Sequence, residues 1–146
     1  MRSFANYLIL PELNLILEYC KGETSVEDAV SMKKAEMADS LYNPNYDIIV
    51  DFQDFETLLG VTTNESISNF FNFLKQIEIK GKIAFLTTKP PQVVISEILK
   101  RLSSTSLTAN IETFSTLEAA IRFIGHPMDK LDLINSKISE LKTDTI

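Results

Sequence analysis

The chain has 146 residues, of which 45% are hydrophobic and 23% are charged, a composition that is typical of one globular domain and excludes a wholly disordered chain. Its net charge of −6, without a cluster of Lys and Arg residues, argues against a nucleic-acid partner. The single cysteine, Cys20, favours a reducing compartment, and no apolar stretch approaches the ~20 residues of a membrane span, so we expect a cytoplasmic protein without a transmembrane segment.

The first part of the sequence predicts a β-hairpin. Residues 4–10 and 13–20 are β-type runs on either side of Pro11-Glu12, and such a short connection is typical of antiparallel strands. The second run alternates, which predicts one face with Leu15, Leu17 and Tyr19 and an opposite face with Asn14, Ile16 and Glu18. We expect Gly22 to end this strand.

A helix is expected after the hairpin, because Ser25 followed by Asp28 is typical of a capping box. The helix should reach about Asp39. Its inner face is predicted to carry four apolar side chains, those of Val26, Val30, Met37 and Leu41.

The middle of the chain predicts a buried strand and a second helix. Residues 46–52 contain the apolar run Ile48-Ile49-Val50, which is typical of a strand covered on both faces. We interpret residues 52–63 as a loop and Asn64 as the cap of a helix that reaches about Ile77.

The last part of the chain predicts two more strands, at 82–88 and 109–114, and three helices. Pro90 begins the first helix. Its inner stripe is predicted to consist of Val94, Ile95, Ile98, Leu99 and Leu102. Ser115 and Glu118 predict a capping box for the next helix, which should end at Gly125, and residues 128–141 predict a final amphipathic helix.

The predicted order of elements is therefore β-β-α-β-α-β-α-β-α with an extra C-terminal helix. Strands that alternate with helices favour an α/β fold with a mostly parallel sheet. We expect one α/β domain at residues 1–126 and an appended helix and tail at residues 127–146.

One stretch in this order carries a family resemblance. Residues 39–52, Asp-Ser-Leu-Tyr-Asn-Pro-Asn-Tyr-Asp-Ile-Ile-Val-Asp-Phe, form a helix end, a short turn and a hydrophobic strand that closes on Asp. Together with the order of elements, this stretch resembles the SpoIIAA-like family of the STAS/CRAL-TRIO type of fold, over roughly residues 6–125. The resemblance implies a STAS-like (SpoIIAA-like) α/β fold.

The resemblance also bears on function. STAS-type anti-sigma-factor antagonists carry an Asp-Ser-(Ser/Thr)-Gly motif after the third strand, and its serine is phosphorylated. The matching residues 54–60 contain no Asp-Ser pair, so this phosphorylation switch is not expected here. The other function that the fold implies is the binding of an apolar ligand, with loose association to a membrane surface.

Three acidic residues, Asp51, Asp54 and Glu56, follow the predicted strand at residues 46–52. Ligands of open α/β sheets bind beyond the carboxyl ends of the strands, and carboxylate oxygens at such a place are suitable ligands for Mg²⁺. The alternative is a polar loop that caps the following segment.

The predicted helix at residues 64–77 has more apolar surface than one buried stripe requires. The surplus side chains suggest a ligand cavity, a partner surface or a helix wedged between the sheet and a neighbour. The candidate interaction residues on this helix are Phe70, Phe71, Phe73 and Ile77.

Three functions remain open. The first is a non-enzymatic regulatory or protein-interaction module that binds a protein partner or forms a homodimer. The second is a binder of a lipid or other apolar small ligand with peripheral membrane association. The third is a metal-dependent enzyme that uses Asp51, Asp54 and Glu56. We favour the first function, for which no catalytic residue, cofactor or metal is expected.

Overall fold

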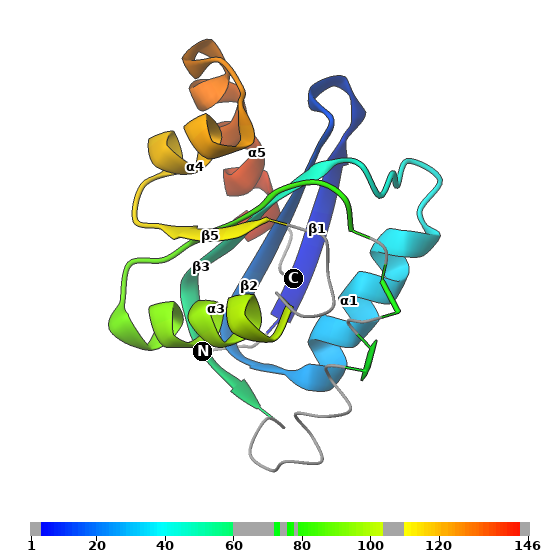
Figure 1. Ribbon diagram of the computed structural model, residues 1–146, viewed down its shortest axis with the longest axis vertical. Coiled ribbons are helices and arrows are strands. Elements are labelled where there is room, and N and C mark those ends of the chain that lie inside the picture. The colour runs from blue at the N-terminus through cyan, green and yellow to red at the C-terminus, as the bar shows by residue number, and fades with distance from the viewer. Residues whose placement is uncertain (1–3, 60–71, 74–75, 78, 104–109, 144–146) are drawn as a thin grey trace.

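The computed structural model describes residues 4–59, 72, 73, 76, 77, 79–103 and 110–143. In this part of the chain five strands form one sheet in the order β1-β2-β3-β4-β5 (Figure 1). The strands are β1 (Phe4–Leu10), β2 (Leu15–Ser25), β3 (Asp47–Leu59), β4 (Ile83–Leu86) and β5 (Ile111–Phe114). Strands β2 to β5 pair in parallel and β1 pairs antiparallel with β2, which confirms the predicted hairpin and the mostly parallel sheet.

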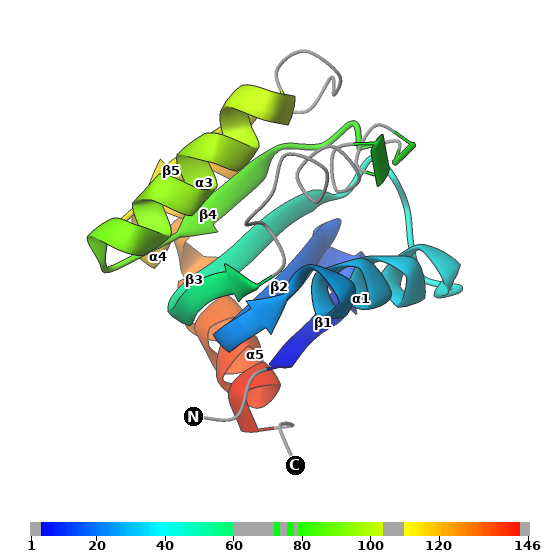
Figure 2. The same ribbon diagram turned by 90° about the horizontal axis from the view of Figure 1, so that it is seen from below.

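Helices cover both faces of this sheet (Figure 2). Helices α1 (Val26–Ala38) and α3 (Pro90–Ser103) lie on one face, and α4 (Leu117–Ile124) and α5 (Leu131–Thr143) lie on the other. The shared face of α1 and α3 follows from the sequential strand order, because right-handed crossovers that advance in one direction place their helices on one side. Two short 3₁₀ turns, η1 (Pro11–Leu13) and η2 (Met128–Lys130), complete the described elements.

The alternation of β2 divides the core as predicted. Leu15, Leu17 and Tyr19 are buried among residues of α4 and α5, whereas Ile16 and Cys20 are buried on the face of α1 and α3. Each face of β2 therefore contacts a separate hydrophobic cluster, which explains why every residue from 15 to 20 is buried.

Two predicted strand ends are wrong. Strand β2 continues past Gly22, which has φ +65°, to Ser25, with a register shift at Gly22. Strand β3 continues to Leu59, although residues 52–63 are predicted as a loop. The two strands pair with each other well beyond the end of β4, and Phe55 is 2% exposed, so tertiary pairing and burial outweigh the polar composition of this segment.

The predicted inner face of α1 is only partly right: Met37 packs against the core, but it is not among the buried residues of the helix. Its buried residues are Met32 and Glu36, and Leu41 lies beyond the helix with 51% of its surface exposed. The capping box of Ser25 and Asp28 is confirmed by hydrogen bonds in both directions. The helix thus begins where predicted but turns a carboxyl group toward the interior.

The predicted stripe of α3 is partly wrong. Ile95 and Leu99 pack on the core, but the fully buried positions are the polar Gln92 and Ser96, while Val94 and Ile98 are exposed. The side chain of Leu102 lies outside the described residues. Buried polar side chains shift the inner face of α3 by part of a turn, because each finds hydrogen-bond partners in the sheet or its own helix.

Helix α4 begins one residue later than predicted. Its N-cap is Thr116, whose hydroxyl accepts a hydrogen bond from the Ala119 backbone, rather than Ser115. It ends at Gly125 with φ +83°, as predicted. Helix α5 buries Ile134, Ile138 and Leu141 against the sheet, and the division of the chain at residues 126 and 127 stays a prediction.

Candidate functional site

A cavity of about 120 Å³ lies between the sheet and helices α1 and α3. Strands β2 to β5 form its floor, and most of its lining is aliphatic or aromatic. The aromatic part consists of Phe52, Phe55, Phe73 and Phe85. The ring of Phe52 stacks on Phe55 at 4.6 Å between centroids and lies 5.0 Å from the ring of Phe85, so neighbouring strands hold these rings in fixed positions.

A charged group interrupts this apolar wall. The ammonium of Lys33, on α1, forms ion pairs with Glu18 on β2 and with Glu36 one turn further along α1, the second at 2.9 Å. The side chains of these three residues are 12%, 7% and 0% exposed. Both Glu18 and Lys33 line the cavity.

The two glutamates of this group differ in their ionisation state. Burial, and then the nearby charge of Glu18, raise the pKa of Glu36 from 4.5 to about 9. Burial opposes ionisation of Glu18 as well, but the charge of Lys33 and hydrogen bonds from both partners outweigh it, so the pKa of Glu18 lies below its ordinary value. Glu36 therefore holds a proton at neutral pH.

The buried oxygen Oε1 of Glu36 is consistent with that proton. It accepts no hydrogen bond from the described residues, whereas Oε2 accepts from Lys33. A buried carboxylate oxygen without a donor is costly, and protonation lowers this cost because it removes the negative charge. Burial keeps Glu36 neutral. The group therefore consists of an ionised Glu18, an ionised Lys33 and a neutral Glu36.

The lone cysteine also lines the cavity. Burial, with the charges of Glu18 and Asp51, raises the pKa of the Cys20 thiol. A nucleophilic cysteine needs a lowered pKa, so Cys20 here contributes a neutral, weakly polar wall.

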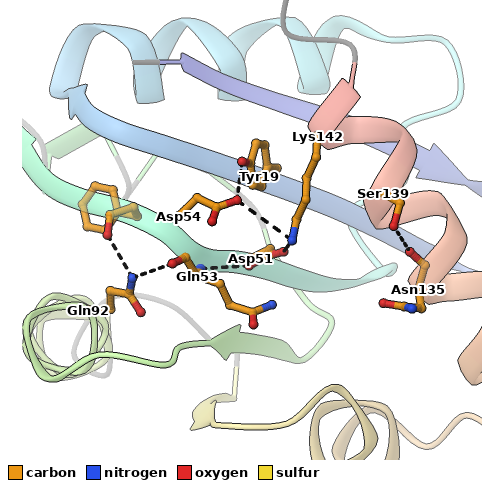
Figure 3. A network of polar contacts seen from close by, with 9 residues as sticks. Tyr19, Asp51, Gln53, Asp54, Gln92, Asn135, Ser139 and Lys142 are labelled. Atoms are coloured by element: carbon orange, nitrogen blue, oxygen red, sulfur yellow. Dashed lines mark hydrogen bonds and ion pairs between the residues drawn. The ribbon is translucent and has the colours of Figure 1, made fainter. Parts of the chain in front are cut away.

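A second polar group lies on the opposite face of the sheet, at the middle of β3 (Figure 3). Lys142 reaches from the last turn of α5 to Asp51, at 3.5 Å, and Asp54, at 4.0 Å. The Tyr19 hydroxyl donates to Asp54 at 2.5 Å, and burial together with this hydrogen bond raises the pKa of Tyr19. The ammonium of Lys142 thus lies beside the carboxylates of Asp51 and Asp54.

Gln92 links α3 to β3 near this group (Figure 3). Its amide NH₂ donates to the carbonyl oxygens of Gln53 and Phe55, at 2.9 and 3.0 Å, and its carbonyl accepts from the backbone of Thr88 and Lys89. The buried amide forms all four of its hydrogen bonds, and these fix the position of α3 relative to β3.

The predicted acidic site is partly assembled. Asp51 and Asp54 lie together in the strand rather than in a loop, and Glu56 is exposed further along β3. Within the described ranges, no group of three or more His, Cys, Asp or Glu side chains is arranged to hold a metal ion.

The predicted phenylalanine site falls largely outside the described part of the chain. Phe70 and Phe71 lie outside it. Phe73 is half-buried and lines the cavity, and Ile77 is buried in the same hydrophobic cluster. The role of these residues in binding stays a prediction.

Sequence reasoning missed the charged group of Glu18, Lys33 and Glu36. One signal was present, because the alternation of β2 places Glu18 on the same buried face as Ile16. A glutamate at such a position must be neutralised by a nearby cation or by a proton. The partner itself could not be predicted, since Lys33 comes from the neighbouring helix.

Comparison with known proteins supports the fold. The chain matches the crystal structure of an uncharacterized protein of the DUF3478 family with a SpoIIAA-like fold, from Shewanella loihica PV-4, with a TM-score of 0.59. The match covers 85% of this chain and 96% of that chain at 11% sequence identity. This chain has a SpoIIAA-like fold. The resemblance seen in residues 39–52 is confirmed at the level of the fold.

This SpoIIAA-like chain has no match among protein-family models or among curated proteins. No helix in the described part is both long and apolar enough to cross a membrane.

Proposed function

We propose that the protein is a non-enzymatic binding module that holds a small apolar ligand in the cavity between the sheet and helices α1 and α3. The observation that carries this proposal is the cavity itself, with four phenylalanine rings and few polar groups in its wall. Binding sites for small molecules are concave and mostly apolar, with a small number of placed polar groups. Cys20 supports a binding role over catalysis, because its raised pKa keeps the thiol neutral.

The size of the cavity sets the size of the ligand. Cavities of about 150 Å³ that are lined by Leu, Ile and Phe stay dry and bind benzene. A volume of about 120 Å³ therefore suits a ligand of about the size of one six-membered ring with a small substituent. A long fatty-acid chain is too large for it, so the ligand class is narrower than lipids in general.

Toluene is a suitable first probe. We expect saturable shifts in the methyl NMR signals of cavity-lining isoleucines, such as Ile48 and Ile95, when toluene is added. The substitution Ala29→Leu fills the cavity from α1 and should abolish these shifts. Ala35→Leu, at an exposed position of the same helix, is the matched control and should leave them unchanged. Shifts that fail to saturate, or that survive Ala29→Leu, would contradict the proposal.

A second candidate function is protein interaction through self-association. The observation that favours it is a set of exposed apolar side chains on α3, with Val93, Val94 and Ile98 at 39%, 56% and 42% exposure. A homodimer through this surface should dissociate in the double variant Val94→Asp, Ile98→Asp. Sedimentation equilibrium over a range of concentrations measures this, and a wild-type protein that stays monomeric throughout rules the candidate out.

A further inference from the structure

The polar part of the cavity wall offers an unused hydrogen-bond donor. A lysine ammonium has three N–H donors. In Lys33 two of them are directed to Glu18 and Glu36, and the third has no partner among the described residues. Because Lys33 also lines the cavity, a ligand inside it can supply the missing acceptor.

The charge of this polar group restricts the ligand. With a proton on Glu36, the charges of Glu18 and Lys33 cancel and the group is neutral. An anionic ligand would leave one net negative charge beside the phenylalanine rings, and a cationic ligand would lie against the ammonium of Lys33. An uncompensated charge in an apolar site is costly, so both are disfavoured.

We propose that the cavity selects a neutral, roughly benzene-sized molecule that carries one hydrogen-bond acceptor, such as a carbonyl oxygen, and that Lys33 donates the hydrogen bond to it. This inference rests on the proposed function and names its ligand class. Lys33 is a binding residue in this scheme, while Glu18 and Glu36 hold its ammonium in place.

Three probes with the same number of non-hydrogen atoms test the inference: cyclohexanone, its isostere methylenecyclohexane, and cyclobutanecarboxylate. Affinities come from titrations of the methyl NMR signals of the cavity. In the wild type we expect cyclohexanone to bind and the carboxylate to bind at least about tenfold more weakly. Tighter binding of the carboxylate would overturn the requirement for a neutral ligand.

The role of Lys33 is tested by the double variant Lys33→Met, Glu18→Gln, which removes both charges and so avoids a buried unpaired carboxylate. It should weaken cyclohexanone by about tenfold or more and leave methylenecyclohexane within about twofold, since a hydrogen bond to a charged donor is lost for the ketone alone. Lys100→Met, at a half-exposed ion pair with Glu112, is the control and should change neither affinity. Equal effects of the double variant on both probes would overturn the assignment to Lys33.

A measurement on the wild type needs no variant. The infrared carbonyl stretch of bound cyclohexanone should lie at lower frequency than in hexane, because the ammonium polarises the carbonyl. An unshifted stretch in a bound ketone would overturn the inference and leave the proposed function standing. If none of the neutral probes binds, the proposed function fails and this inference with it.

Discussion

The ammonium nitrogen of Lys142 lies 3.5 Å from the carboxylate oxygen Oδ2 of Asp51, so the last turn of α5 is tied to the centre of the sheet (Figure 3). Asp51 is 1% exposed, and this oxygen accepts no hydrogen bond from the described residues. The Gln53 backbone donates a hydrogen bond to the other oxygen, Oδ1, and Lys142 supplies a positive charge beside Oδ2. Because Lys142 belongs to the segment at residues 127–146, its contribution connects that segment to the stability of the rest of the chain.

Replacing Lys142 with Met should lower the free energy of unfolding by about 1–2 kcal/mol, because it removes the cation beside a buried carboxylate, while solvent screens part of the loss at the half-exposed lysine. Urea denaturation measures the change. Lys137→Met, which removes an exposed pair with Glu140 on the same helix, should cost less than about 0.5 kcal/mol. Equal losses for the two variants would show that the link to Asp51 contributes nothing.

The features that are predicted well from the sequence depend on local patterns. The alternation of β2, the capping box at Ser25 and the apolar stripe of α5 each depend on a few neighbouring residues, and all three are found in the structure. The extension of β3 is different, because residues 53–56 contain three polar side chains and become a strand through pairing with β2.

The polar groups were harder to predict for a related reason. Glu36 is buried on α1 because Lys33 and a proton neutralise it and its neighbour Glu18, which lies on another element. A pattern of hydrophobic residues along one helix contains no information about a cation and a carboxylate that meet across a layer. The same holds for Gln92, whose partners at Gln53 and Phe55 are more than thirty residues away.

The proton on Glu36 predicts a dependence of stability on pH. Since its pKa rises from 4.5 to about 9 on folding, the native state binds the proton more tightly. Its contribution is fully present below about pH 4.5 and is lost as the pH rises toward about 9, with a slope of at most about 1.4 kcal/mol per pH unit. Glu36→Gln, which mimics the protonated carboxyl, should remove this slope.

The difference in the free energy of unfolding between Glu36→Gln and the wild type isolates this effect from other titrating groups. Measured by urea denaturation from pH 5 to 8.5, it should shift steadily in favour of the variant as the pH rises. Glu140→Gln, at an exposed position of α5, serves as the control and should give a flat difference. A flat difference for Glu36→Gln as well would mean that Glu36 is ionised in the native protein.

A substitution of Gln92 tests whether its amide fixes α3 to the sheet. In Gln92→Glu the shape is kept, but a carboxylate oxygen replaces the NH₂ that donates to the carbonyls of Gln53 and Phe55. Two buried carbonyls lose their donor and face a negative charge, so we expect a loss of about 2–4 kcal/mol at neutral pH. The loss should shrink as the pH falls, because protonation restores one donor.

The control for Gln92→Glu is Gln76→Glu, at an exposed position, which should change the free energy of unfolding by less than about 0.5 kcal/mol. Thermal or urea unfolding at pH 7 and pH 4.5 gives both values. A similar small change for Gln92→Glu at both pH values would show that solvent reaches this amide and that α3 is not held through it.

Gly81 allows the close approach between the turn before β3 and the start of β4. A Cβ atom at this position would lie 2.2 Å from the carbonyl oxygen of Tyr46, and that carbonyl belongs to the backbone, which cannot rotate away. The neighbouring hydrogen bonds, from the Lys82 backbone to Asp47 at 2.8 Å and from the Ile48 backbone to Lys82 at 2.8 Å, depend on the same spacing. Gly81→Ala should therefore separate the two strands at their beginning and cost about 1–3 kcal/mol.

Gly125→Ala is the matched comparison, because nothing lies within 4 Å of a Cβ there and the strain comes from φ +83° alone. A residue with a side chain in that conformation costs about 1 kcal/mol, so Gly81→Ala should be the more destabilising of the two. Urea denaturation ranks them, and hydrogen exchange of the Ile48 amide reports locally, since its acceptor is the Lys82 carbonyl. If that amide keeps its wild-type protection in Gly81→Ala, relative to the global stability of each protein, the strands tolerate the side chain and steric overlap is not what requires glycine at this position.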